Sequence, residues 1–309
     1  MNLINKCVFC LKEETISNSV FSNVFKSEQA YLVSIKTHRV AAKLCRMFGR
    51  KTRLDYLDIK KNKYQNCHLI FDNESATYLT KKQLLSLKEG NNKIVLFLID
   101  ELANDYLSIN NARALIKEKA FDEVYTYSAY DAAKYGFKHA LCYYSKFDTS
   151  EDVSVAYDAF FIGNVKKRSA IINDFLTESN KHGLKNLFLL SGNTSAISGG
   201  PFKEISFMDY QSSISELRKC NCIIDFVDDK NKGQSLRYFE AIVYNKKLIT
   251  NNPNIKDLPL YNKKYMRIIN EINEIDYEWV KKRELIDYGY DSRFEPINLV
   301  KLLNGGQNT

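Results

Sequence analysis

The sequence predicts an α/β fold with two domains, each a parallel sheet covered by helices. The chain has 309 residues, enough for two domains of ordinary size. Short apolar, β-rich runs alternate with helical patterns almost throughout, which favours parallel sheets. A polar stretch without helical periodicity at 145–157 separates two such regions. We therefore expect an N-terminal domain at 1–150 and a C-terminal domain at 151–309, which includes two C-terminal helices.

The first half contains three clear strand patterns. These are "CHLIF" (67–71), "KIVLFLI" (93–99) and "EVYTYS" (123–128), and the last two read as strands buried on both faces. Helical patterns follow at 111–120 and 129–137.

The second half repeats this alternation. Strands are predicted at 159–163, 186–192, 203–209, 222–227, 247–250 and 265–269. Helices are predicted at 166–183, 210–220 and 235–245. The tail after 277 reads as helical in two pieces, broken near Pro296.

The charge balance indicates a mildly basic, soluble surface. Hydrophobic residues make up 45% and charged residues 27%, and the net charge of +8 comes from 45 basic and 37 acidic residues. No run of five like charges occurs, so we expect no nucleic-acid partner. Anionic small molecules, or weakly an anionic membrane face, suit this balance.

The cysteines and the apolar runs indicate a cytoplasmic protein. A zinc site would require Cys7 and Cys10 to meet Cys220 and Cys222, and neither spacing is typical of one. The favoured interpretation is small buried strand residues in a reducing compartment. No apolar run is long enough to span a membrane, and "MNLINKCVFCLKEE" is not a signal peptide.

The segment "GQSLRYFEAIVYNKKLITNN" (233–252) has the order loop, helix, turn, strand. Gly233 allows close backbone approach, and the first helical amides could bind a pyrophosphate together with Arg237. Glu240 lies at the polar margin of the apolar stripe, where a ribose diol could bind it. The alternative is an ordinary helix capped by Ser235, with a surface Glu240 paired to a lysine.

The segment "GNVKKRS" (163–169) places a glycine and basic residues directly after a strand. This order is typical of phosphate binding at a strand's carboxyl end. The alternative is a solvated basic helix start, which the helix dipole disfavours. A flexible loop at another strand end, "SGNTSAISGG" (191–200), could also line a site.

The segment "LIDELAND" ends the most apolar strand of the first half. Asp100 or Glu101 there could act as a general base or accept a hydrogen bond from a hydroxyl. A helix N-cap at Asp100 with an acidic first turn is equally compatible. No D-x-D occurs, and "DNE" (72–74) is a weak metal candidate.

Together these segments resemble the bacterial GT-B glycosyltransferases of lipopolysaccharide, O-antigen and capsular polysaccharide gene clusters. "FDEVYTYSAYDAAKYGFKHALCYY" (121–144) is similar to the "FD-x-V-x-S/T-F/Y…DA-x-KY" segment of that group. The segment at 233–252 resembles its nucleotide-sugar segment, and the resemblance covers about 93–255. It implies two Rossmann-like domains that face a cleft, the GT-B arrangement.

The resemblance also implies a nucleotide-sugar donor bound mainly by the C-terminal domain, without a metal or other cofactor. The usual GT-B E-x7-E spacing is absent, because no glutamate lies eight residues before Glu240. The candidate catalytic residues are Asp100 and Glu101. The candidate donor-binding residues are Gly163, Asn164, Lys166, Lys167, Arg168, Gly192, Asn193, Gly233, Gln234, Ser235, Arg237 and Glu240.

Two functions of different class follow. The favoured one is a hexosyltransferase that extends a lipid-linked glycan at the cytoplasmic membrane face. The other is a non-catalytic nucleotide- or sugar-binding partner subunit of the same pathway. An NAD-dependent enzyme is disfavoured because the G-x-G-x-x-G fingerprint is absent.

Overall fold

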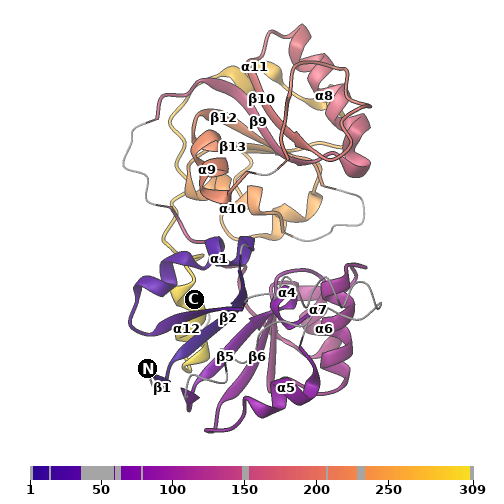
Figure 1. The fold of residues 1–309 in the computed structure, drawn as a ribbon. Coiled ribbons are helices and arrows are strands. Elements are labelled where there is room, and N and C mark those ends of the chain that lie inside the picture. Colours follow the sequence, from indigo (N-terminus) through magenta and orange to yellow (C-terminus); the bar gives the residue numbers. More distant parts are fainter. Residues whose placement is uncertain are drawn as a thin grey trace. The chain divides into compact units, whose positions relative to one another are not determined.

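The computed structural model describes residues 3–13, 15–35, 59, 64–77, 79–147, 153–206, 208–227 and 234–306. The chain divides into two compact units (Figure 1). Unit 1 comprises Met1–Lys146 together with Arg293–Thr309, and unit 2 comprises Phe147–Ser292. Each unit contains a sheet of parallel strands with helices packed on it, which confirms the predicted α/β class.

The sheet of unit 1 has the strand order β3-β2-β5-β6-β7-β8, and each neighbouring pair is parallel. The strands are β2 (Cys7–Lys12), β3 (Ala30–Ile35), β5 (His68–Asp72), β6 (Lys93–Leu98), β7 (Glu123–Thr126) and β8 (Lys138–His139). The short strands β1 (Leu3–Ile4) and β4 (Tyr64–Gln65) pair separately. The order reverses between β2 and β5, so a crevice is expected beyond their carboxyl ends.

Helices cover both faces of this sheet. They are α1 (Ile16–Val20), the 3₁₀ helix η1 (Ser22–Lys26), α4 (Asn73–Ala76), α5 (Lys81–Ser86), α6 (Leu107–Lys117), α7 (Ala129–Tyr135) and α12 (Ile297–Leu303). Local signals set their ends. Thr80 and Gln83 form a capping box on α5, and α7 runs from the Ser128 cap to Gly136, whose φ of 70° is left-handed.

The sheet of unit 2 has the order β11-β10-β9-β12-β13-β14, again with parallel neighbours. The strands are β9 (Tyr157–Asn164), β10 (Asn186–Ser191), β11 (Lys203–Glu204), β12 (Cys220–Asp225), β13 (Lys247–Thr250) and β14 (Met266–Ile268). Counted from β9, this is the 3-2-1-4-5-6 order of dinucleotide-binding sheets. The predicted strand at 203–209 is wrong in length, since β11 has only two residues.

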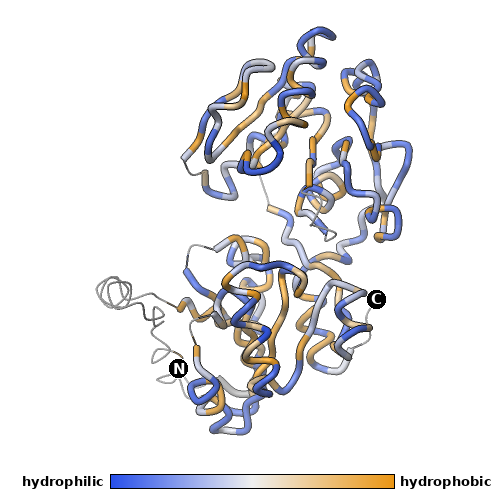
Figure 2. Tube along the Cα trace, turned by 90° about the vertical axis from the view of Figure 1, so that its right-hand side faces the viewer, coloured by the Kyte–Doolittle hydropathy of each residue, from blue (hydrophilic) through white to orange (hydrophobic). Residues whose placement is uncertain are grey.

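The helices of unit 2 are the 3₁₀ helix η2 (Lys166–Arg168), α8 (Ser169–Lys181), α9 (Tyr210–Arg218), α10 (Leu236–Val243), the 3₁₀ helices η3 (Pro253–Asp257) and η4 (Ile272–Glu274), and α11 (Tyr277–Lys281). Helices α8 and α11 bury apolar side chains in one core cluster, whereas α9 contacts β12 and α10 contacts both β12 and β13. Figure 2 shows the hydrophobic residues concentrated in the strands and on inward helix faces.

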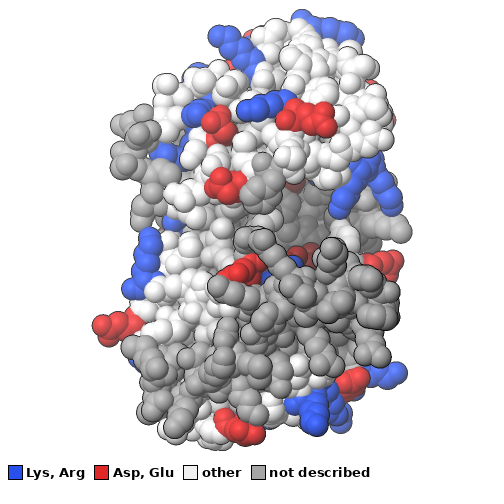
Figure 3. Space-filling model, in the orientation of Figure 1, with Lys and Arg blue, Asp and Glu red and all other residues white. Residues whose placement is uncertain are grey.

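Charged residues and cysteines are distributed as expected. Lysine and arginine side chains are interspersed with acidic ones on the face drawn in Figure 3. Cys7 and Cys10 are buried in β2, and Cys220 and Cys222 are buried in β12, a strand of the other unit. None of the described helices combines the length and apolarity needed to cross a bilayer.

The C-terminal helix α12 packs in unit 1, so its prediction as part of a C-terminal domain at 151–309 is wrong. Leu299, Val300 and Leu303 of α12 lie in a core cluster with side chains of β2, β6 and η1. Figure 1 accordingly shows α12 (yellow) beside β2 (indigo). The tail has an apolar stripe, but nothing in its sequence says which sheet that stripe covers.

We predict that Leu299→Ala destabilises unit 1 by about 2–5 kcal/mol, because the fully buried side chain leaves a cavity. Leu285→Ala is the matched control, since Leu285 is 91% exposed. Urea denaturation followed by fluorescence measures both. Equal midpoints for the two variants would show that α12 contributes nothing to the core.

Candidate functional site

The candidate site of unit 2 lies where the strand order reverses. β9 and β12 are neighbours there, and their last residues are Asn164 and Asp225. The connections leaving these two strands run in opposite directions along the sheet, and the carboxyl ends at such a point are where α/β sheets generally bind ligands. Residues 163–169 and 234–240 both border these ends, since Arg168 bonds to Phe226 and the Ser235 hydroxyl bonds to Asp225.

Arg168 bridges the two strand ends. Its Nη1 donates a hydrogen bond to the carbonyl oxygen of Phe226 at 2.9 Å, and its Nη2 donates to the carbonyl oxygen of Asn164. The guanidinium carbon lies 5.4 Å from the ring centroid of Phe161. A Cβ on Gly163 would lie 3.0 Å from Nη2, so this glycine makes room for the arginine. The result is a fixed positive charge at the reversal point.

Asn164 and Gly192 lie side by side at the ends of β9 and β10. Gly192 has a φ of 87°, and a Cβ there would lie 2.7 Å from Asn164 Oδ1. The same Oδ1 accepts a hydrogen bond from the backbone nitrogen of Lys166 at 3.1 Å. The side chains of Lys166 and Lys167 are exposed on η2, so their charges face solvent beside the strand ends.

The loop predicted to be flexible is attached to α8. Asn173 Oδ1 accepts hydrogen bonds from the backbone nitrogens of Ser198 and Gly199 at 2.8 and 3.0 Å. A Cβ on Gly199 would lie 2.2 Å from the Asn173 carbonyl oxygen, so only glycine allows this contact. Asn193 accepts hydrogen bonds from Ser195 within the loop. Residues 198 and 199 of this loop are thus held against α8, and its place in a binding site stays a prediction.

The helix α10 begins as predicted. Ser235 is its N-cap, and the Ser235 hydroxyl accepts a hydrogen bond from the backbone nitrogen of Arg237 at 3.1 Å. Gln234 is half-buried just before it, and Gly233 lies outside the described residues.

Glu240 is fully buried, so the alternative of a surface Glu240 paired to a lysine is wrong. Its Oε2 lies 2.5 Å from Arg237 Nη1, and its Oε1 accepts a hydrogen bond from the Tyr210 hydroxyl at 2.5 Å. Burial raises the pKa of Glu240, whereas the charge of Arg237 and the Tyr210 hydrogen bond oppose the rise. Glu240 thus holds Arg237 in place rather than facing solvent.

Asp225 was not singled out in the sequence, although it ends the central strand β12. It is buried, and its Oδ2 accepts a hydrogen bond from the Thr250 hydroxyl at 3.0 Å. Burial raises the pKa of Asp225, and the Ser235 hydroxyl and the charges of Arg237 and Arg168 act in the opposite direction. Asp100 was predicted as a site residue because it is a carboxylate at the end of an apolar strand. Asp225, in "CIIDFV" (222–227), has the same position in its strand.

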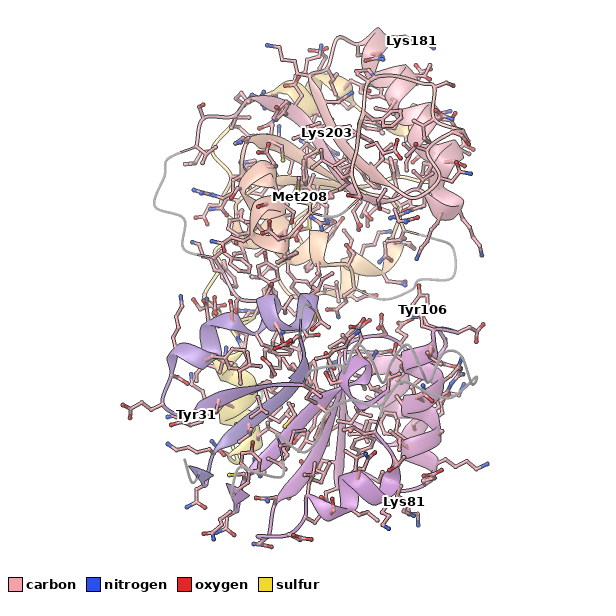
Figure 4. All side chains as sticks on the ribbon, in the orientation of Figure 1. Tyr31, Lys81, Tyr106, Lys181, Lys203 and Met208 are labelled. Atoms are coloured by element: carbon pink, nitrogen blue, oxygen red, sulfur yellow. The ribbon has the colours of Figure 1, made fainter. Side chains whose placement is uncertain are left out.

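In unit 1, Asp100 follows β6 and is not a helix cap. The next helix, α6, begins at Leu107, and the residues between are neither helix nor strand. Tyr106, labelled in Figure 4, marks that helix start. Glu101 is half-buried in the same loop. The N-cap alternative for Asp100 is therefore excluded.

Asp100 lies among other carboxylates. Burial raises the pKa of Asp100, the negative charge of Asp72 adds to the rise, and a hydrogen bond from Asn73 opposes it. Burial, Asp72 and Asp100 likewise raise the pKa of Glu74, while Lys12 lowers it. Asp72 caps α4 through the Ser75 backbone nitrogen at 2.6 Å. A protonated, neutral carboxyl is thus favoured here more than in water.

The motif "DNE" gains no support as a metal site. Asp72 serves as a helix cap, and Asn73 bonds to neighbouring protein groups. Among the described residues, no group of three or more His, Cys, Asp and Glu side chains could hold a metal ion.

Comparisons with known proteins identify the fold and not a family. The chain matches no protein-family model and no curated protein. A putative UDP-N-acetylglucosamine 2-epimerase from Listeria monocytogenes aligns with a TM-score of 0.56 at 10% identity, over 98% of this chain and 96% of that one.

Two further solved structures align over large parts of the chain. T4 phage BGT in complex with UDP-glucose gives a TM-score of 0.51 at 11% identity, over 89% of this chain and 88% of that one. TarM gives 0.51 at 11%, over 77% of this chain and 54% of that one. The chain thus has the fold with two Rossmann-like domains, as the sequence predicted.

We predict that Glu240→Ala destabilises the protein by about 3–5 kcal/mol, because it leaves Arg237, 17% exposed, without its buried partner. Glu178→Ala is the matched control: Glu178 also pairs with a residue three positions away, Lys181, but both are exposed. We expect a loss of at most about 0.5 kcal/mol there. Thermal unfolding compares them, and a similar loss in both would contradict the structural role of Glu240.

Proposed function

We propose that this protein is a glycosyltransferase that moves a sugar from a nucleotide-sugar donor to a hydroxyl of a glycan acceptor. The observation that carries the proposal is the convergence of Arg168, Arg237 and Asp225 on the strand ends at the reversal point of unit 2. The shared fold with T4 phage BGT, solved with UDP-glucose, supports it.

The charged side chains at the strand ends of unit 2 suit a nucleotide sugar, which has a negative diphosphate and several hydroxyl groups. Arg168 and Arg237 balance the buried carboxyl groups of Asp225 and Glu240. The exposed side chains of Lys166 and Lys167 and the first amides of α10 are further groups that can contact a diphosphate. Asp225 can accept hydrogen bonds from ribose or sugar hydroxyls.

In unit 1, we propose Asp100 as the base or orienting group for the acceptor hydroxyl. It is half-buried at a strand end, where a carboxylate can accept a proton, and its raised pKa makes it a stronger base than an exposed aspartate. Glu101, in the same loop, is the second candidate.

The narrower features of the proposal concern the acceptor, the metal and the cellular location. We propose a hexose donor, a lipid-linked bacterial surface glycan as acceptor, catalysis without a divalent metal, and weak contact of a cytoplasmic protein with the inner membrane face. The net charge of +8 favours anionic lipid. Sedimentation with anionic and neutral vesicles at low salt tests the last point, and equal binding to both would contradict it.

A second candidate is a sugar-nucleotide epimerase, because the putative epimerase structure aligns over 98% of this chain. Both enzymes would bind a nucleotide sugar, so binding alone does not separate them. Incubation with the donor alone does: an epimerase interconverts two nucleotide sugars, which NMR detects, whereas a transferase needs an acceptor. A binding subunit gives neither product.

We expect one of a panel of nucleotide sugars to raise the melting temperature, and Lys166→Gln/Lys167→Gln to weaken its binding about tenfold by removing two charges near the diphosphate. Lys181→Gln/Lys185→Gln is the matched control, with the same charge change at exposed sites elsewhere in unit 2; Lys181 ends α8 (Figure 4). Calorimetric titration gives both affinities. Equal weakening by both double variants would place the diphosphate elsewhere.

We expect Asp100→Asn to lower kcat for transfer about 100-fold or more, because the amide cannot accept the proton. Donor affinity should not change.

A base acts when deprotonated, so wild-type kcat should rise as pH rises through the raised pKa of Asp100 and then level off. Initial rates across pH, with and without EDTA, measure this. A wild-type rate for Asp100→Asn would remove Asp100 from catalysis, and loss of activity in EDTA would contradict metal independence.

A further inference from the structure

We infer that Asn73 is a positioning residue for Asp100, and that it determines which carboxylate oxygen meets the acceptor. Asn73 is the first residue of α4 and is completely buried. Its side-chain amide makes three contacts, all with the segment that carries Asp100 or with the helix that follows it. This inference rests on the proposed role of Asp100.

The orientation of the Asn73 amide is fixed by a backbone group. The backbone nitrogen of Ile99 donates a hydrogen bond to Asn73 Oδ1 at 2.9 Å. A backbone N–H can only donate, so the oxygen of the amide must point toward it. The nitrogen must then point the other way, toward Asp100.

The Asn73 Nδ2 group donates to Asp100 Oδ2 at 3.1 Å and to the Ser108 hydroxyl at 3.3 Å. The end of β6 and the first turn of α6 are therefore connected through a single side chain. Among the described residues, Asp100 Oδ1 makes no hydrogen bond. Oδ1 is thus the oxygen that remains to accept a proton from an acceptor hydroxyl.

Asn73 is itself held rigidly. The preceding residue, Asp72, caps α4 through the backbone nitrogen of Ser75, and the Ser75 hydroxyl accepts a hydrogen bond from the backbone nitrogen of Lys12 at 2.8 Å. The Thr77 hydroxyl donates to the Asn73 carbonyl oxygen at 2.7 Å. A side chain with this many fixed neighbours can hold its partner in one geometry without reorganisation.

The same hydrogen bond controls proton affinity at Asp100. Donation from an amide N–H stabilises the charged carboxylate, and it offsets part of the effect of burial and of Asp72. Without it, Asp100 would hold its proton to higher pH. The hydrogen bond from Asn73 therefore helps the half-buried Asp100, which lies near the carboxylate of Asp72, to act as a base.

Asn73→Asp tests this with little change of shape. The new carboxylate can still accept from Ile99, but it can no longer donate to Asp100, and it adds a like charge. We expect the acid limb of the kcat–pH profile to move to higher pH by about one pH unit or more, with the donor KM unchanged. At a pH below the limb, kcat then falls about tenfold or more.

Asn92→Asp is the matched control. Asn92 is also a buried asparagine of unit 1 that accepts from a backbone nitrogen, that of Cys67 at 3.0 Å, and donates to backbone carbonyl oxygens. It precedes the first residue of β6, at the opposite end of that strand from Asp100. We expect it to lower stability without moving the acid limb.

Titration of the Asp100 carboxyl carbon by NMR in the full chain gives a readout independent of turnover. If the wild type transfers no sugar, the proposed function fails, yet the titration still shows whether Asn73 controls Asp100. An unchanged Asp100 titration in Asn73→Asp, or an equal shift in Asn92→Asp, overturns the inference. If Asn73→Asp does not fold, Asn73→Ser, which removes the amide without adding charge, replaces it with the same expected direction.

Discussion

A charge buried at the end of a parallel strand must find its partner inside the protein, and this requirement organises both units. Parallel strands deliver their carboxyl ends to one edge of the sheet, so the polar groups that follow them meet there. Asp225 and Glu240 are buried at or near that edge in unit 2, and Asp72 and Asp100 lie there in unit 1. An unpaired carboxylate in such a place would cost several kcal/mol, on the order of the stability of a whole domain.

The two units meet this requirement with different partners. In unit 2 the partners are arginines, so the strand ends combine fixed positive charges with hydrogen-bond acceptors. In unit 1 Asp72 and Asp100 are held by neutral amides, hydroxyls and backbone nitrogens, and Asp72 raises the pKa of Asp100. Both raise the pKa of Glu74, which the charge of Lys12 lowers. The first environment suits an anionic ligand, and the second suits proton transfer from a hydroxyl. This division of chemistry is what the proposed reaction needs.

Much of the architecture could be read from the sequence because it depends on local signals. Apolar runs such as 93–99 and 247–250 match β6 and β13, and Ser235 caps the predicted helix. Contacts between residues far apart in sequence could not be predicted from such local signals. The burial of Glu240 depends on Tyr210, thirty positions away in sequence, and the attachment of the loop at 191–200 depends on Asn173.

In the candidate site, too, local sequence signals indicate some residues, whereas other residues are identified only by their contacts in the structure. A position next to a strand end is the sequence signal for the candidates Asp100 and Arg168, and Asp225 carries the same signal. The helix-cap alternative for Asp100 could be resolved only once the start of α6 was known. Asn73 carried no sequence signal of its own, because an amide gains its role only from the groups on either side of it.

The packing of α12 on unit 1 has a consequence for the order in which the protein matures on the ribosome. Synthesis proceeds from the N-terminus, and domains generally fold as units as they emerge. Unit 2 is one continuous segment, Phe147–Ser292, and can close its core as soon as it is made. Unit 1 begins before unit 2 in the chain but lacks the apolar face of α12 until residues 297–303, which follow unit 2, have left the exit tunnel. Unit 1 therefore completes its core after unit 2, although its first strands are translated before unit 2.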